Sequence, residues 1–158
     1  MEKMRVLGID PGPKESAYCV WDGEKIQDSG KVPTEAVLDV IYKASTFNET
    51  CVACEHLQCF GMGVGKEVFE TAYWIGDFRG HCRHHGIKFI PVFRGDVKSY
   101  WCQSQRATDS NIRFALEDRF GPKGTKKNPG LMYPLVGSDM RSAFAIAVMV
   151  HDKSVRQA

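Results

Sequence analysis

The chain has 158 residues, of which 43% are hydrophobic and 25% are charged, and its formal net charge is +2. This length fits one domain over residues 1–158, large enough to bury a core without disulfide or metal staples. The sequence begins without a signal-peptide pattern and contains no apolar run long enough to cross a membrane, so we expect a cytoplasmic protein with no membrane partner.

Three short strands are predicted first, over residues 4–10, 16–21 and 25–32. The turn-forming segments PGPKES and DGE separate them, so we expect an antiparallel meander. A helix follows over residues 35–44, where apolar residues recur at helical spacing. The segment CVACE, residues 51–55, then predicts a short buried strand.

A glycine-rich segment, FGMGVG, leads into a long predicted helix over residues 66–85. The buried stripe of this helix is expected to contain Val68, Ala72, Ile75 and Cys82. The segment IKFIPV, residues 87–92, then predicts the fifth strand.

The last third of the chain is predicted to be mainly helical. A short helix is expected near Asp96, and a longer one begins at Thr108 or Asp109 and ends at Phe120. A mobile basic loop, GPKGTKKNPG, precedes an apolar helix over residues 139–151 that Ser138 caps. The whole order predicts an α/β fold with one mixed five-stranded central sheet flanked by helices.

The cysteine and histidine pattern raises the question of a zinc site. Cys51 and Cys54 form a CxxC, and the segment HCRHH offers further ligand types. However, an offset of three in a strand places two side chains on opposite faces. Because the six cysteines are irregularly spaced and no export signal is present, we expect reduced thiols and disfavour zinc.

Charge is distributed unevenly along the chain. From Arg79 to Lys127 there are eleven Lys and Arg against four acids, a net of +7, and the remainder sums to −5. A nucleic-acid enzyme needs this arrangement, with cations for phosphate around an acidic centre. The alternative is an ordinary solvated surface.

Three carboxylates are candidates for that acidic centre. Asp10 ends the first strand and Glu55 ends the fourth, while Asp139 lies in the first turn of the last helix. If the first and fourth strands pair, the three acids converge, and they then repel one another unless a cation lies between them. Hard oxygen ligands suit Mg²⁺ or Mn²⁺. Singly, each acid has an ordinary explanation as a turn former, a strand end or a favourable charge at a helix N-terminus.

The sequence resembles RuvC-like Holliday junction resolvases of the ribonuclease H-like superfamily, of a phage type, from Val6 to Val150. The motifs that carry this resemblance are GIDPG, CEHLQCFGMGVGKEVFETAYWIGDFRG, PVFRGDVKSYW and GSDMRSAFAIAVMV. It implies a ribonuclease H-like fold and a homodimer, in a bacterial or phage-infected host cell, that nicks a four-way DNA junction symmetrically. It also implies two Mg²⁺ ions per site, replaceable by Mn²⁺, with Asp10, Glu55 and Asp139 as catalytic metal ligands.

The chain departs from the family pattern at one position. Bacterial members carry Asp-x-x-Asp in the last helix, whereas this chain has Ser142 three residues after Asp139. Positions i and i+3 share a helix face, so Ser142 is expected to approach the metal site through its hydroxyl group, without charge. A substitute ligand from elsewhere in the chain is an open alternative.

Two kinds of side chain are expected to contact DNA. Phe60 and Met62, on the glycine-rich loop, are expected to press against bases, although Phe60 could instead pack beneath its loop. Cationic candidates for phosphate contacts are Lys98, Arg106, Arg113, Lys123, Lys126, Lys127 and Arg141.

The long helix over residues 66–85 is the expected dimerisation surface. It carries more aromatic area than one core stripe can hide, at Phe69, Tyr73, Trp74 and Phe78. Core packing of most of these side chains is the alternative.

The sequence suggests three alternative functions. A non-catalytic junction-binding protein would explain the weakened acid set, although all three acids are present. A ribonuclease H-like nuclease acting on flaps, other branched DNA or RNA is hard to separate by sequence. A sugar-kinase or actin-like phosphotransferase also begins with Gly-x-Asp-x-Gly, but it needs two lobes, for which this chain is too short.

Overall fold

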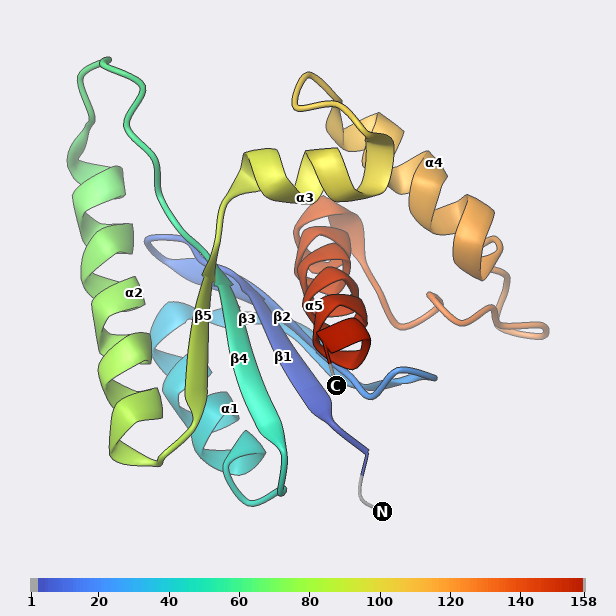
Figure 1. Cartoon of the computed structure of the whole chain (residues 1–158), viewed down its shortest axis with the longest axis horizontal. Helices are drawn as coiled ribbons and strands as arrows, with labels where there is room; N and C mark the ends of the chain where they lie inside the picture. The colour runs from blue at the N-terminus through green and yellow to red at the C-terminus, as the bar shows by residue number, and fades with distance from the viewer. Residues whose placement is uncertain (1–2, 158) are drawn as a thin grey trace.

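The computed structural model describes residues 3–157, which form a five-stranded sheet with helices on both faces (Figure 1). In chain order the strands are β1 (Arg5–Asp10), β2 (Glu15–Trp21), β3 (Ile26–Pro33), β4 (Thr50–Glu55) and β5 (Lys88–Val92). The helices are η1 (Thr34–Ala36), α1 (Val37–Ala44), α2 (Lys66–His84), α3 (Arg94–Cys102), α4 (Asp109–Phe120) and α5 (Gly137–Gln157). Within the described residues, no helix is long and apolar enough to cross a membrane.

The strand order is β3-β2-β1-β4-β5. Strands β1, β2 and β3 form the expected antiparallel meander, whereas β4 and β5 run parallel to β1. The carboxyl ends of β1, β4 and β5 therefore meet at one edge of the sheet. This confirms the mixed α/β sheet expected from the sequence.

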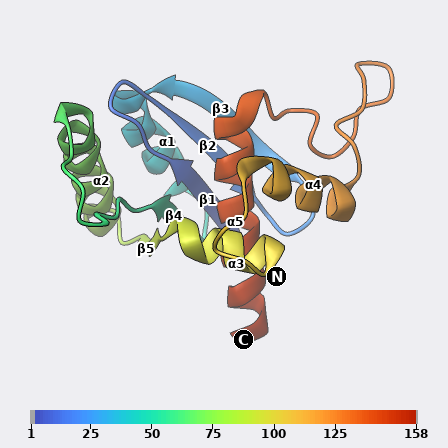
Figure 2. The same ribbon diagram turned by 90° about the horizontal axis from the view of Figure 1, so that it is seen from above.

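Each face of the sheet has its own hydrophobic core. Leu7 and Ile9 of β1 pack with α1 and α2 on one face, and Val6 packs with α3, α4 and α5 on the other. Figure 2 shows these two helical layers on either side of the sheet. The alternation follows from the strand period of two, and it places Gly8 and Asp10 on the α5 face with Val6.

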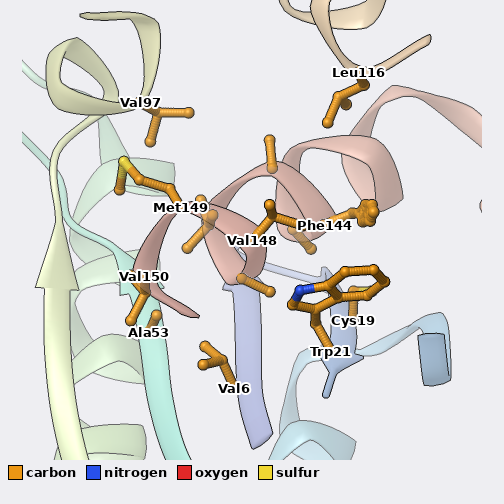
Figure 3. Close-up of a cluster of buried hydrophobic side chains, with 14 of the residues drawn as sticks. Val6, Cys19, Trp21, Ala53, Val97, Leu116, Phe144, Val148, Met149 and Val150 are labelled. Carbon is orange, nitrogen blue, oxygen red and sulfur yellow. The ribbon is translucent and has the colours of Figure 1, made fainter. Parts of the chain in front are cut away.

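Helix α5 packs directly against β1 and β2 on one face of the sheet. Residues 143–150 are all buried, and in the cluster of Figure 3 Phe144 contacts Trp21 edge-to-face with ring centroids 5.2 Å apart. Ala143 and Ala147 face Gly8 of β1, which has no side chain to hold the helix away. This close approach brings the first turn of α5 to the sheet edge where β1 ends.

Several sequence-based details are wrong. The last helix begins at Gly137 and continues to Gln157, so Ser138 lies within it and does not precede it as a cap. The helix expected near Asp96 is present and begins at Arg94, with Asp96 in its first turn. In α2 the prediction is confirmed for Ile75 and Cys82, but the other buried residues are Thr71 and Phe78, and Val68 is only half-buried. Ala72 is exposed because the helix packs against the sheet with a different rotation about its axis.

The two cysteines of the CxxC lie on opposite faces of β4, as expected. Cys51 belongs to the core beneath α5, and Cys54 belongs to the core beneath α1 and α2. All six cysteines are free, and burial raises the pKa of the Cys51 thiol to about 11. Both side chains are thus packed neutral thiols.

Candidate active site

Asp10 and Glu55 end two neighbouring parallel strands. Ile9 of β1 is in register with Cys54 of β4, so the next residue on each strand, Asp10 and Glu55, lies side by side at the sheet edge. The hydrogen-bond ladder between β4 and β5 continues one residue past Glu55, where the His56 amide donates to the Val92 carbonyl at 2.8 Å. Both carboxylates are therefore positioned by strand backbone and only partly exposed.

The turn after Asp10 is fixed by a small hydrogen-bonded network. The Gly12 amide donates to Ser16 Oγ at 3.0 Å, and Thr34 Oγ1 donates to the Gly12 carbonyl at 2.8 Å. The buried hydroxyl groups of Ser16 and Thr34 are themselves 3.0 Å apart. A Cβ on Gly12 would lie 2.2 Å from the Glu15 carbonyl oxygen, so the turn requires glycine there. The GIDPG segment is thus built to hold Asp10 in one place.

Burial and the neighbouring carboxylates raise the pKa of Asp10 to about 8. Loss of solvation is the largest cause, followed by the negative charge of Glu55 and a hydrogen bond with it, and then by Asp139. Arg94 opposes the shift. A carboxylate pair of this kind is stabilised by a cation placed between its oxygens.

Asp139, the third acid, is close enough to influence Asp10 but is paired with a lysine. Lys31 Nζ of β3 donates to Asp139 Oδ2 at 2.8 Å and lies 3.9 Å from Glu15 Oε2. The hydrogen bond with Asp139 is the main cause of the raised pKa of Lys31. The structure therefore brings all three predicted acids to one edge, with a cation on the third.

A second cation lies on the opposite side of the acids. Arg94, at the start of α3, is paired with Asp109 at the start of α4, and its Nη1 atom is 4.0 Å from Glu55 Oε1. Sequence reasoning missed Lys31, Arg94 and Asp109 as site residues. All three are charged residues at or near the end of a strand or helix. The sequence alone does not show which of these ends lie beside the acids, because that depends on the order of the strands in the sheet.

Ser142 faces the groove between α5 and α4. It is half-buried and lines a pocket of about 220 Å³ whose other polar walls include Asp109, Arg113 and Arg141. Asp109 is thus a carboxylate on the Ser142 side of the site, linked to Glu55 through Arg94.

The donor set fits a hard divalent cation at the Asp10–Glu55 pair. Burial and the charge of Glu55 both disfavour the ionised form of Asp10 when no cation is near, and carboxylate oxygens are the ligands that Mg²⁺ and Mn²⁺ prefer. Yet among residues 3–157 no group of three His, Cys, Asp or Glu side chains is arranged to hold a metal ion. Asp139 would have to leave Lys31 to complete such a set.

A pocket of about 510 Å³ adjoins Glu55 on the β5 side. Its lining includes Phe60, Arg94 and Lys98. Phe60 and Met62 are 79% and 76% exposed, so Phe60 does not pack beneath its loop. Figure 1 shows this loop extending beyond the sheet edge between β4 and α2.

The other predicted DNA contacts lie on the α3–α4–α5 side. Arg106 is exposed between α3 and α4, and Arg113 is paired with Glu117 within α4. Lys123 lies in the loop from α4 to α5, and Arg141 is half-buried at the Ser142 pocket. Of these cations, Lys98 shares a pocket with Glu55, and Arg141 lies two residues after Asp139 on α5.

The basic loop has a defined turn at its tip. The Thr125 and Asn128 amide groups each donate to the other residue's carbonyl at 3.1 Å, which leaves Lys126 and Lys127 as the exposed tip. Gly124 and Pro129 form a bridge just behind it. In Figure 2 this loop extends on the far side of α5 from α2.

The sequence matches no protein-family model and no curated protein. Solved structures do match it. The Thermus thermophilus RuvC in complex with Holliday junction substrate has 18% identity and a TM-score of 0.72, covering 98% of this chain and 96% of that chain. A second structure of Thermus thermophilus RuvC has 17% identity and a TM-score of 0.66, with 97% of each chain covered.

A yeast mitochondrial Holliday junction resolvase, Ydc2, is also similar, with 15% identity and a TM-score of 0.59 over 98% of this chain and 81% of that chain. At such low identities the agreement concerns the course of the backbone. Since it extends over nearly the whole chain in all three comparisons, the protein has the RuvC-type, ribonuclease H-like fold.

Proposed function

We propose that this protein is a structure-selective endonuclease that resolves four-way DNA junctions by divalent-metal-dependent hydrolysis of phosphodiester bonds. The observation that carries the proposal is the Asp10–Glu55 pair, two carboxylates held side by side at the carboxyl edge of a RuvC-type sheet. Burial and the neighbouring carboxylates raise the pKa of Asp10 to about 8, a perturbation typical of functional sites, and a bound cation would favour its ionised form. One of the similar structures is a RuvC in complex with Holliday junction substrate, which supports branched DNA as the substrate.

Asp10, Glu55 and Asp139 are the residues that would hold Mg²⁺ or Mn²⁺. Ser142, one turn after Asp139 on α5, lines the neighbouring pocket with Asp109. Two such ions would supply an activated water and charge stabilisation at the leaving oxygen. Asp10 would be the central ligand, because Glu55 and Asp139 both lie close enough to raise its pKa. Arg94 lies on the other side, with its Nη1 atom 4.0 Å from Glu55 Oε1, and places a positive charge near that carboxylate.

The DNA is proposed to cross the acidic edge between two cationic regions. Lys98 shares a pocket with Glu55, and Arg141 lies two residues after Asp139 on α5, while Lys123, Lys126 and Lys127 lie on the loop beyond α4. Phe60 and Met62 project from the loop after Glu55, where apolar side chains can stack on unpaired bases at the centre of a junction.

A homodimer would provide two such sites for symmetric nicks. Phe69 and Tyr73 of α2 are 59% and 80% exposed, and they lie on one helix face with Gly76 and Gly80. A Cβ on either glycine would meet nothing within 4 Å, so this face is open to close approach of another helix. Phe78 is fully buried and belongs to the core, which corrects its place in the expected dimer surface.

The decisive experiment is cleavage of a substrate panel in Mg²⁺ by the wild type and by Asp10→Asn. The panel contains four-way, three-way, flap and duplex substrates in DNA and RNA. We expect paired nicks in the four-way DNA junction, and we expect Asp10→Asn to bind that junction without cutting it. Faster cleavage of flaps or RNA would transfer the proposal to another ribonuclease H-like nuclease, and cleavage by Asp10→Asn within severalfold of wild type would refute the site.

Two observations favour a non-catalytic junction-binding protein as the second candidate. Ser142 replaces a carboxylate, and Asp139 is already neutralised by Lys31. A protein of this kind would bind four-way junctions tightly in EDTA and cut no member of the panel with either Mg²⁺ or Mn²⁺.

A further inference from the structure

Lys31 reaches the acidic site along a single transverse row of the sheet. In the strand registers, Asp10 is opposite Ala17, and Ala17 is opposite Lys31. Directly opposed residues share a face, so Lys31 and Asp10 point to the α5 side with only the small Ala17 between them. Neighbouring strands are about 4.8 Å apart, which a lysine side chain can span. Lys31 therefore joins the site from two strands away.

The ammonium group of Lys31 is hydrogen-bonded to Asp139 Oδ2, a carboxylate oxygen that a metal ion would need. Its Nζ atom is 2.8 Å from Asp139 Oδ2, and the side chains of the two residues are 44% and 47% exposed. A carboxylate oxygen bound to a lysine is less available to Mg²⁺, since both cations compete for the same charge. The partial exposure of both groups makes the pair weak enough to exchange.

A DNA phosphate offers Lys31 another anion. Substrate that enters the acidic edge must pass its backbone close to Asp10 and Asp139, where Lys31 already lies. The ammonium group can then donate to a phosphate oxygen and remain neutralised. Glu15, 3.9 Å from Nζ, remains near the lysine in either position.

We propose that Lys31 couples substrate binding to metal binding, a role that rests on the nuclease function proposed above. Without DNA, Lys31 holds Asp139 away from the ligand set. When a backbone phosphate enters, Lys31 transfers its hydrogen bond to it and releases Asp139 to join Asp10 and Glu55. By thermodynamic linkage, DNA then strengthens metal binding and metal strengthens DNA binding.

A purely structural explanation also exists, because β3 is an edge strand and edge strands often carry lysine to prevent strand pairing between molecules. The two explanations differ in sign. If Lys31 competes for Asp139, its removal strengthens metal binding to the DNA-free protein. If it also contacts phosphate, the same removal weakens DNA binding in EDTA.

The test is Lys31→Met, with Lys43→Met as the matched control. Lys43 is exposed on α1, on the other face of the sheet, so the control removes the same charge far from Asp139. Binding of Mn²⁺ alone to the DNA-free protein is measured by electron paramagnetic resonance, and four-way junction binding is measured in EDTA. Lys31→Met should bind Mn²⁺ about 2- to 5-fold more tightly, in keeping with an exposed ion pair, and should bind the junction more weakly.

Lys31→Arg keeps the charge and should behave like wild type, and a melting curve checks that each variant is folded. Lys31→Gln serves in its place if Lys31→Met does not fold. Unchanged or weaker Mn²⁺ binding would overturn the proposal, as would unchanged junction binding. Failure of the nuclease function looks different, because the wild type would then cut no substrate while the opposite changes in Mn²⁺ and junction binding could still be measured.

Discussion

Gly8 of β1 faces Ala143 of α5 so closely that a Cβ on Gly8 would lie 2.2 Å from the Ala143 carbonyl oxygen. This contact sets the distance between the sheet that carries Asp10 and the helix that carries Asp139. Gly8, the first glycine of the GIDPG segment, is therefore needed for α5 to cross β1 two residues before Asp10.

Gly8→Ala is expected to displace α5 and to damage both stability and cleavage. The backbone oxygen cannot move aside as a flexible side chain would, so we expect a loss of about 2–4 kcal/mol in the free energy of unfolding. Urea unfolding measures this loss. Cleavage by the remaining folded protein should also fall, because Asp139 moves with the helix.

Gly63→Ala is the control for stability, since a Cβ at Gly63 meets nothing within 4 Å and its φ angle is not positive. It should change the free energy of unfolding by less than about 0.5 kcal/mol. Equal stability of Gly8→Ala and wild type would mean that α5 can retreat from the strand without loss.

The main features of the sheet and the two strand-end acids could be predicted because they depend on local patterns. Asp10 and Glu55 each follow an apolar strand, and such a residue can lie only at a sheet edge. The cations Lys31 and Arg94 could not be predicted, because their positions depend on strand order and register between distant segments.

The errors in α2 have a different physical origin. The predicted stripe containing Ala72 and the observed stripe containing Thr71 and Phe78 both satisfy helical spacing. Only packing against α1 and the sheet decides the rotation of the helix, and this rotation buries Phe78 and exposes Tyr73. Aromatic content alone therefore overestimated the exposed surface.

The raised pKa of Asp10 predicts how stability depends on pH in the metal-free protein. Because the folded state binds the Asp10 proton more tightly than the unfolded state, stability is greatest below about pH 4 for this group and falls as pH rises to about 8. Asp10→Asn removes this fall. At pH 8 in EDTA the variant should be more stable than wild type by at least about 1 kcal/mol in urea unfolding.

Asp22→Asn should act in the opposite direction. Burial of Asp22 favours its neutral form, but hydrogen bonds from the Lys25 and Glu24 amide groups outweigh this effect and lower its pKa. Its ionised form thus stabilises the fold, and its loss should destabilise the protein near neutral pH.

The Asp10 prediction fails if the difference in free energy of unfolding between wild type and Asp10→Asn is the same at pH 5 and pH 8. That result would contradict the proposed repulsion at the acidic edge.

Tyr73→Glu is expected to convert a dimer into a monomer. The change places a charge on the exposed face of α2 without touching the core, because Tyr73 is 80% exposed. Sedimentation velocity at micromolar concentration measures the outcome. Phe114→Glu on α4 is the control, as Phe114 is 63% exposed but lies on another surface. If the Tyr73→Glu variant is still a dimer, or if the wild type is a monomer at every concentration, α2 is not the dimer interface.

Replacing Lys126 and Lys127 with Ala should weaken junction binding and flatten its salt dependence. Both side chains lie at the exposed tip of a hydrogen-bonded turn, so the change should leave the fold intact. The loss of two phosphate contacts should reduce the slope of log K against log salt by about 2. Gel shifts in EDTA over a range of salt concentrations measure this slope. An unchanged slope would mean that both lysines are ordinary solvated residues.

Ser142→Asp restores a carboxylate where the last helix lacks one, and it should lower the Mg²⁺ concentration that gives half-maximal cleavage. Ser142 is half-buried, one turn after Asp139, beside a pocket that already contains Asp109 and two arginines. The arginines can stabilise the new charge, so the variant should fold. Single-turnover cleavage across a Mg²⁺ titration provides the measurement.

Ser138→Asp is the control because Ser138 lines the same pocket but is exposed. If only Ser142→Asp lowers the metal requirement, Ser142 faces the metal site. An equal effect of both variants would indicate a general gain of negative charge, and a folded Ser142→Asp with an unchanged requirement would show that the missing acid is replaced elsewhere, with Asp109 as the nearest carboxylate on that side.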